Sequence, residues 1–431
     1  MSVVVLELGL GEAAKSFQLE KAVCSHGFFM MPPNQWDPLS KSLLRPLRLD
    51  TTDSDSDSVL VRISQHSWAP QSLHVSVHYP YALTPQHRHS LLTQVDEDRS
   101  FDGRVFRSPT LFEDMVKCIL LCNCQWPRTL SMARALCELH LELHTQSSHV
   151  LLSEAGSTES KTPISGNHNF IPNTPLLKDT KTKLKESHIL ADNIGEDDSF
   201  QNCKTCLQAA EELYNIGNFP SPTELAKLDE SFLATRCNLG YRAIRILKLA
   251  RAIVEGQIQL TQLEEESKGA SLSQSSYNKL ADQLKAIYGF GPFTCANVLM
   301  CMGVYHVIPT DSETIRHLRQ EHARNSTVQT VERDVEHIYG KYAPFQFLAY
   351  WSELWHFYEK SFGKLSEMPC SDYKLITASL IFPSAPFQIL SNNQEEGKKK
   401  AQCPDNVKHE AQARRPWLSC QHWSDSHAMP K

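Results

Sequence analysis

The residues with the clearest chemical potential lie in one continuous segment, from Leu284 to Leu318. Its first part places Gly289 and Gly291 on either side of Phe290, between two stretches whose apolar residues recur at helical spacing. Such a turn uses the conformational freedom of glycine and leaves backbone N–H groups at the start of the second helix, where a phosphate can bind without base contacts. A G-x-G sequence is weak evidence by itself, because ordinary helix–helix turns also contain it.

A single carboxylate follows the second helix, at the end of the run V-I-P-T-D that closes on Asp311. Thr310 and Glu313 match the T-x-x-E capping box, which predicts that Asp311 is the first residue of another helix. The helix dipole at that position favours the ionised carboxylate. An aspartate in a first helical turn is also common for purely structural reasons, and spacing alone supports the two interpretations about equally.

The hairpin, the apolar helix and the I-P-x-D sequence together resemble the HhH-GPD signature of the helix-hairpin-helix base-excision DNA glycosylases. The similarity covers residues 105–145 and 200–365. It is greatest to the 8-oxoguanine and 3-methyladenine II branches and, for the whole chain, to plant members. The resemblance implies that Asp311 stabilises the positive charge that develops on the deoxyribose as the glycosidic bond breaks. It also implies that Gly289 and Gly291 contact the DNA backbone.

Phe293 occupies the position at which bifunctional members of this superfamily carry a lysine. That lysine attacks the sugar and cuts the strand through a Schiff base, so its replacement implies a monofunctional enzyme that uses water. The resemblance also assigns Phe293, Asn297, Phe347 and Trp351 to the pocket for a flipped base, oxidised or alkylated, on which aromatic rings could stack. The spacing of Phe347 and Trp351 is equally typical of a plain helical core.

The L-G-Y-R-A run at 239–243 and a helix and loop at 119–137 are similar to two segments of the 8-oxoguanine branch. In that branch these segments contact the base opposite the lesion. The resemblance implies that four residues enter the duplex and contact the estranged cytosine: Asn123, Arg128, Tyr241 and Arg242. Without it, Arg242 is more simply interpreted as one of a solvated set that neutralises phosphates, with Arg236, Arg245, Lys248 and Arg251.

The elements that must position these residues give an α+β fold class. Two runs within residues 1–104, at 59–63 and 72–79, alternate apolar and polar side chains, and this part predicts an N-terminal antiparallel β-sheet domain. Residues 105–145 and 200–365 have helical periodicity and predict an all-α helix-hairpin-helix core. Residues 146–199 are polar and predict a disordered insertion, and residues 386–431 predict a disordered tail.

Composition narrows the class of protein further. Most of the 13 cysteines lie in apolar helical patterns, which is typical of a reducing compartment. The apolar first residues lack a basic region and a long apolar core, so we expect no signal peptide, and no segment reaches membrane-spanning length. The net charge of −6 argues mildly against a general nucleic-acid binder, so DNA binding would depend on local basic clusters. Cys203 and Cys206 lack the further ligands of a zinc site, and the four-cysteine iron–sulfur loop of one branch is absent.

We therefore expect a monomer that binds double-stranded DNA with a damaged base, does not bind membranes, contains no metal and works in the nucleus. The resemblance implies no cofactor, although a monovalent cation could bind at the hairpin. The leading function is a monofunctional DNA N-glycosylase of base excision repair. A glycosylase fold that binds damaged DNA without catalysis is the alternative. A helical protein-interaction bundle would leave the spacing from the hairpin to Asp311 unexplained.

Overall fold

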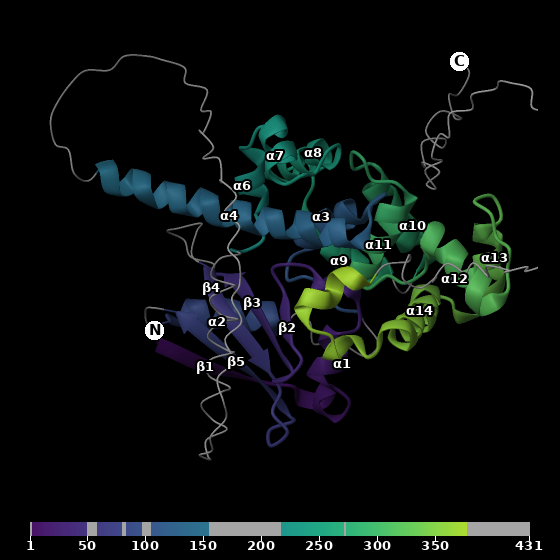
Figure 1. The fold of residues 1–431 in the computed structure, drawn as a ribbon, viewed down its shortest axis with the longest axis horizontal. Helices are drawn as coiled ribbons and strands as arrows, with labels where there is room; N and C mark the ends of the chain where they lie inside the picture. Colours follow the sequence, from purple (N-terminus) through teal and green to yellow (C-terminus); the bar gives the residue numbers. More distant parts are fainter. Residues whose placement is uncertain are drawn as a thin grey trace, which may run out of the picture.

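The computed structural model describes residues 2–49, 58–79, 83–96, 105–154, 217–270 and 273–376. The N-terminal part forms a five-stranded antiparallel sheet in the order β1-β5-β4-β3-β2 (Figure 1). Its strands are β1 Ser2–Gly9, β2 Gln35–Asp37, β3 Ser42–Arg48, β4 Ser58–Ser64 and β5 Ser72–Tyr79. The predicted antiparallel sheet is confirmed.

The alternation of side chains places one face of the sheet in the core. Val75 pairs with Ile63 and Val77 with Val61, and all four side chains are buried. His74 and Ser76, which lie between them on β5, are half-buried on the other face. This is the period-2 pattern from which the strand was predicted.

Helices make up most of the remainder, so the predicted α+β fold class is confirmed. The described N-terminal part contains the α-helices α1 Leu19–Val23 and α2 Pro85–Asp96, together with short 3-10 helices at Gly11–Lys15 and Gly27–Met30. The helical part contains α3 Leu111–Leu121, α4 Trp126–Glu154, α6 Pro222–Ala226, α7 Glu230–Arg236, α8 Arg242–Val254, α9 Leu260–Ala270, α10 Gln274–Lys285, α11 Pro292–Cys301, α12 Ser312–His322, α13 Val331–Tyr339 and α14 Gln346–Phe362. In Figure 1, α4 runs above the sheet, and α9 to α14 lie to its right.

One predicted boundary is wrong. Helix α4 continues to Glu154, although the polar composition predicted a disordered insertion from residue 146. A helix that has already formed adds a hydrogen bond for each residue it fixes, so it can extend into a sequence that would not start one. The predictions for residues 155–199, for Cys203 and Cys206 and for the tail at 386–431 concern residues outside the described ranges.

A buried ion network joins the sheet to the helical part. Glu113 on α3 lies 3.1 Å from Nη2 of Arg45 on β3 and 2.7 Å from Nζ of Lys117 on α3. All three side chains are almost completely buried. Burial by itself would raise the pKa of Glu113. The positive charges of Arg45 and Lys117 lower this pKa by more than burial raises it, so the net shift is downward. The carboxylate therefore stays charged between two cations in the core.

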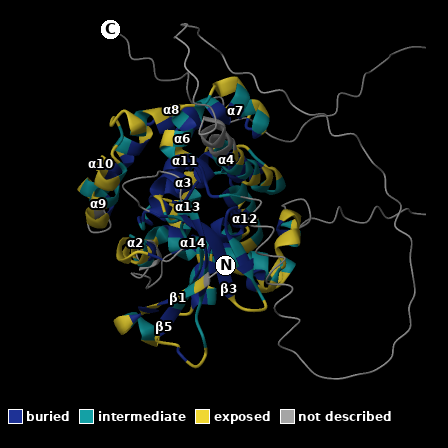
Figure 2. Ribbon diagram, turned by 90° about the vertical axis from the view of Figure 1, so that its left-hand side faces the viewer, coloured by how far each residue is buried: buried dark blue, intermediate teal, exposed yellow. Residues whose placement is uncertain are grey.

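Residues from the C-terminal helices pack back against the N-terminal part. The indole N–H of Trp36 on β2 donates to the carbonyl oxygen of Ser366 at 2.8 Å. The indole N–H of Trp351 on α14 donates to the carbonyl oxygen of Ser25, also at 2.8 Å. One hydrophobic core cluster includes residues of the sheet and of the helices, and Figure 2 shows the buried residues between them.

We predict that Glu113→Gln destabilises the protein by about 3–5 kcal/mol, because it leaves two buried cations without their shared anion. The free energy of unfolding can be measured by urea denaturation of the whole chain. Glu12→Gln is the control, since Glu12 makes an exposed ion pair with Lys15 and its loss should have no measurable effect. Equal stabilities for the Glu113 variant and the wild type would contradict the importance of this network.

Candidate active site

The G-F-G turn joins α10 to α11, as the sequence predicted. Gly289 has a φ of +82°, which favours glycine, whereas Gly291 is the N-cap of α11 with a φ of −100°, which any residue adopts. No side chain caps α11 in the described structure, and Pro292 is its first residue. The backbone N–H groups of the first turn are thus available to an external acceptor.

Basic and aromatic side chains of α8 lie next to this turn. Nζ of Lys248 is 3.7 Å from the ring centroid of Tyr288, and the guanidinium carbon of Arg245 is 4.7 Å from that of Tyr241. A Cβ atom on Gly289 would come within 2.8 Å of the Arg245 side chain. The missing side chain of Gly289 thus allows α8 to approach the hairpin.

The other basic residues of this segment are engaged elsewhere. Arg236 forms an ion pair with Glu142. Arg251 donates to the carbonyl oxygens of Ala226 and Leu228, at 3.2 and 3.0 Å. Of the basic set proposed from the sequence, Arg245 and Lys248 are therefore the members that flank the hairpin.

Asp311 is the N-cap of α12, and this corrects the predicted capping box. Its Oδ1 accepts the backbone N–H of Thr314 at 3.0 Å, so the pattern that forms is D-x-x-T rather than T-x-x-E. Glu313 does not fold back to Thr310. Its carboxylate instead accepts from Nε of Arg316 at 2.8 Å and from the Tyr358 hydroxyl at 2.6 Å.

The Thr314 hydroxyl connects Asp311 to α14. Its Oγ1 lies 3.0 Å from Oδ1 of Asp311, 2.5 Å from the carbonyl oxygen of Pro309 and 3.0 Å from the Tyr350 hydroxyl. The single proton of this hydroxyl can serve only one of the first two acceptors, while Tyr350 can donate to it. Tyr350 was missed in the sequence, although it is three residues after Phe347 and therefore on the same helical face.

The Asp311 carboxyl group has an unusual acidity. Burial raises its pKa to about 6, and the nearby charge of Glu313 acts in the same direction. The hydrogen bonds from Thr314 act against the shift without cancelling it. The net effect is opposite to what the helix dipole alone predicted. The side chain remains partly exposed, and the capping bonds from Thr314 go to Oδ1.

The four expected base-pocket residues form two pairs. On α11, the Asn297 amide donates to the carbonyl oxygen of Phe293 at 2.8 Å, so this side chain binds to its own helix. On α14, Phe347 is 1% exposed and stacks on Trp351, with ring centroids 6.0 Å apart. Phe347 therefore matches the core alternative, whereas Trp351 is half-buried and Phe293 is half-buried at the start of α11.

In this structure the Arg242 guanidinium binds backbone carbonyls, and its expected contact with the estranged cytosine stays a prediction. Arg242 is 2% exposed, and its guanidinium donates to the carbonyl oxygens of Cys122 and Asn123. These carbonyls belong to the C-terminal end of α3, where a cation is favoured by the helix dipole. Tyr241 donates to the Cys122 carbonyl oxygen as well, at 3.0 Å. Arg242 is thus a residue that positions the turn at Asn123.

The other residues expected to enter the duplex are accessible. Asn123 is exposed and has a φ of +47°, a left-handed conformation that asparagine tolerates better than most residues. Arg128 is exposed and donates to the Asn238 carbonyl oxygen at 3.3 Å. Tyr241 is 45% exposed.

Two clusters in the described part of the chain have side chains that could bind a metal ion. They are His140, His144 and Glu224, and His317, His322 and Glu353. Neither contains Asp311. No described helix is both long and apolar enough to cross a membrane.

Comparisons with known proteins give matches among solved structures. No family model and no curated protein matches the sequence. The chain is similar to MBOgg1 in complex with a low-affinity DNA ligand, with 17% identity, a TM-score of 0.42 and coverage of 82% of this chain and 99% of that one. It is also similar to the apo form of the 8-oxoguanine glycosylase/lyase of Clostridium acetobutylicum, with 12% identity, a TM-score of 0.43 and coverage of 82% and 96%. The same bacterial enzyme with double-stranded DNA containing cytosine opposite 8-oxoG matches at 13% identity and a TM-score of 0.40, with coverage of 78% and 92%.

We predict that the stability advantage of Asp311→Asn over the wild type grows as the pH rises from about 4 to about 6. A carboxyl group with a raised pKa in the folded state stabilises the fold only while it is protonated, and this contribution is lost as the pH rises through that range. Asparagine caps helices as well as aspartate does, so the cap itself is preserved. The change should be roughly 1–3 kcal/mol between pH 4 and pH 7, measured by urea denaturation of both proteins. A difference independent of pH would contradict the raised pKa.

Proposed function

We propose that this chain is a DNA N-glycosylase that hydrolyses the N-glycosidic bond of a damaged base, with Asp311 as its catalytic carboxylate. The observation that carries the proposal is the state of Asp311: a partly exposed carboxylate, fixed by the first turn of α12, with a pKa raised to about 6. Near pH 7 such a group is mostly ionised but poorly hydrated. It therefore gains more from a positive charge that develops beside it than a well-hydrated carboxylate would.

In the proposed reaction the Asp311 carboxylate has two roles, to stabilise a positive charge and to accept a proton. As the bond between base and sugar breaks, positive charge develops on the deoxyribose, and the Asp311 carboxylate stabilises it. A water molecule then attacks the sugar carbon, and Asp311 can orient it and accept its proton. An amine nucleophile has no candidate in this segment, because the sequence contains no lysine between Lys285 and Lys341 and has Phe293 at the start of α11. This supports hydrolysis without strand cleavage.

The hairpin and the basic side of α8 are the proposed contacts to the DNA backbone. The uncapped start of α11 offers N–H groups to a phosphate, and Arg245 and Lys248 add positive charge beside it. These local positive charges could bind DNA although the net charge of the whole chain is −6. A monovalent cation bound to the hairpin would act in the same place, and the proposal includes no other cofactor.

Asn123 and Arg128 are proposed to face the base opposite the lesion. Both are exposed, and the Asn123 turn is held by Arg242 and Tyr241. Phe293 and Trp351, each half-buried, are the proposed aromatic contacts of the extrahelical base, with Asn297 beside Phe293. We propose that the working form is a monomer bound to double-stranded DNA in the nucleus.

The test is single-turnover excision on duplexes that carry 8-oxoguanine, 3-methyladenine or an undamaged base, each opposite all four bases. We expect one lesion to be released, with strand breaks only after alkali, and a rate that rises with pH through about 6 as Asp311 ionises. Asp311→Asn should lower the rate about 10²–10³-fold and leave duplex binding intact. Binding without excision by the wild type would instead indicate a non-catalytic DNA-binding protein, and normal excision by Asp311→Asn would refute the assignment of the carboxylate.

A second prediction compares the two glycines of the hairpin. Gly289→Ala places a side chain at a φ of +82° and against Arg245, so it should weaken duplex binding at least fivefold. Gly291→Ala is the matched control, since its φ is −100° and a Cβ atom there has no neighbour within 4 Å. Binding is measured on undamaged duplex at two salt concentrations, and melting temperatures report on folding. Wild-type duplex binding by Gly289→Ala would argue against the hairpin as a phosphate contact.

A further inference from the structure

Four polar side chains from three helices converge at the C-terminal end of α12. His317 and His322 belong to α12, Tyr339 is the last residue of α13, and Glu353 belongs to α14. Nε2 of His322 lies 2.8 Å from Oε2 of Glu353, and Nε2 of His317 lies 3.4 Å from the same oxygen. The Tyr339 hydroxyl donates to that oxygen at 2.6 Å and is 3.1 Å from both imidazole nitrogens.

The spacing of these atoms suits a small divalent cation. Ligand atoms at about 2.0–2.1 Å from a tetrahedral zinc ion lie roughly 3.3 Å from one another. The two imidazole nitrogens are 2.8 and 3.4 Å from the carboxylate oxygen, and all three atoms lie within 4.8 Å of one another. Two imidazoles and a carboxylate form a ligand set that zinc commonly accepts, with water at the fourth position.

The protonation of the imidazoles is free to change. In the metal-free protein the Nε2 atoms face the Glu353 carboxylate, which only accepts, and so carry the protons. Nδ1 of His317 is buried without a hydrogen-bond partner in the described structure, so no donor prevents the proton from moving to that nitrogen. Without a metal, an Nε2 proton on each histidine can be donated to Glu353 or to Tyr339. With the proton on Nδ1 instead, both Nε2 atoms present lone pairs toward Glu353.

The charge at this cluster also favours a cation. Among the described residues, the ion pairs recorded for Glu353 are those with the two histidines, which carry no charge when neutral. Arg316, which precedes His317, is paired with Glu313 instead. His322 and Glu353 retain side-chain exposures of 24% and 39%, so an ion and a water ligand can enter from solvent.

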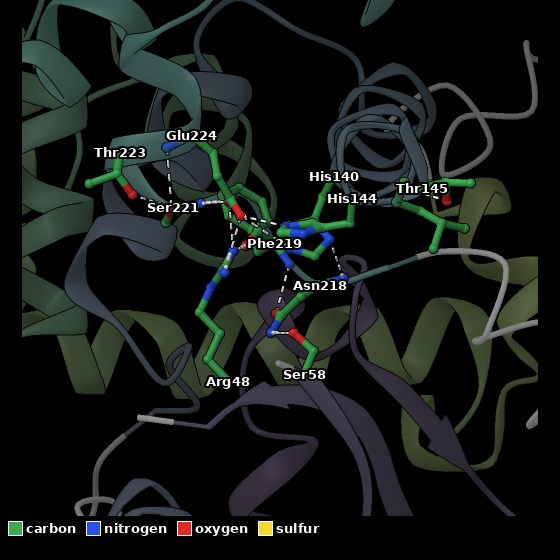
Figure 3. Close-up of polar contacts among 11 residues, drawn as sticks. Arg48, Ser58, His140, His144, Thr145, Asn218, Phe219, Ser221, Thr223 and Glu224 are labelled. Atoms are coloured by element: carbon green, nitrogen blue, oxygen red, sulfur yellow. Dashed lines mark hydrogen bonds and ion pairs between the residues drawn. The ribbon is translucent and has the colours of Figure 1, made fainter. Parts of the chain in front are cut away.

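A second cluster in the same molecule has the same composition but fails as a metal site. Figure 3 shows His140 and His144 of α4 beside Glu224 of α6. The backbone N–H of Asn218 donates to Nδ1 of His140 at 3.2 Å, so the proton of the neutral ring is on Nε2 and that atom has no lone pair for a metal. Glu224 is already neutralised by Arg48, whose Nη2 lies 2.7 Å from Oε2.

We propose that His317, His322 and Glu353 form a zinc-binding site that ties the end of α12 to α14. Its role is structural. His317 lies six residues after Asp311, roughly 9 Å along the helix axis, so the ion would fix the helix that begins at that carboxylate. The proposal does not depend on the proposed function, because the ion contacts neither Asp311 nor the hairpin.

The experiment uses the full chain, freed of metal with a chelator that is then removed. Zinc is titrated in competition with a chromophoric chelator, and cobalt(II) is used as a spectroscopic probe in a parallel titration. We expect His322→Ala and Glu353→Gln each to lose one equivalent of zinc and the visible cobalt bands of a nitrogen and oxygen site. Glu353→Gln keeps the shape of the side chain and an acceptor for His322, so it tests the site even if His322→Ala folds poorly.

The matched control is His144→Gln, which alters the second cluster and should bind as much zinc as the wild type. At a free zinc concentration of about 100 times Kd, the unfolding equilibrium constant of the wild type and of this control should fall about 100-fold. That of His322→Ala should not change. The same zinc stoichiometry and cobalt spectrum in the wild type and in both site variants would overturn the proposal, as would a loss of zinc confined to His144→Gln.

Discussion

The buried carboxylate of Glu113 is the contact on which the arrangement of the two parts of the chain depends. It lies between Arg45 of the sheet and Lys117 of its own helix, and neither cation has access to water that could replace it. Any other packing of α3 on the sheet that broke this pair and kept its members buried would leave charges unpaired in an apolar core, which is far more costly than losing the same pair at a surface. Helix α3 in turn packs against α8 and α11 and offers its last carbonyls to Tyr241 and Arg242. The position of the hairpin helix and that of the Asn123 turn therefore both follow from α3.

Asp311 combines two requirements that oppose each other. As an N-cap it accepts a backbone N–H, which favours the charged form, yet its surroundings remove water and place Glu313 nearby, which favours the neutral form. The second influence is the larger, and the pKa rises. A carboxylate held in this state is less stable than one in water, and it is stabilised when a positive charge arrives. The removal of water from the Asp311 carboxylate therefore lowers the stability of the fold and also lets the carboxylate stabilise a cation more strongly.

The sequence predicted the features that depend on local patterns. Alternation along β5 and the apolar stripe of α3 are set within a few residues, and both elements form as predicted. The cap of α12 was predicted wrongly because T-x-x-E and D-x-x-T overlap at Thr310 and Asp311, and local spacing does not choose between them. The family resemblance assigned Arg242 to the DNA, and its carbonyl contacts could not be predicted because Cys122 and Asn123 are about 120 positions earlier in the chain. The cluster at His322 and Glu353 escaped notice for the same reason.

Helix α12 owes its orientation to α14. Near its start, the Thr314 hydroxyl meets Tyr350, and near its end, His317 and His322 meet Glu353. Tyr350 and Glu353 are three residues apart and so lie on one face of α14, which means that both contacts resist rotation of α12 about its axis. Helix α14 is itself held to the N-terminal part by the hydrogen bond from Trp351 to Ser25. A carboxylate on a free loop would have to be ordered each time it meets a substrate, at a cost in conformational entropy. Asp311 is already ordered by folding, because its direction is fixed by two packed helices.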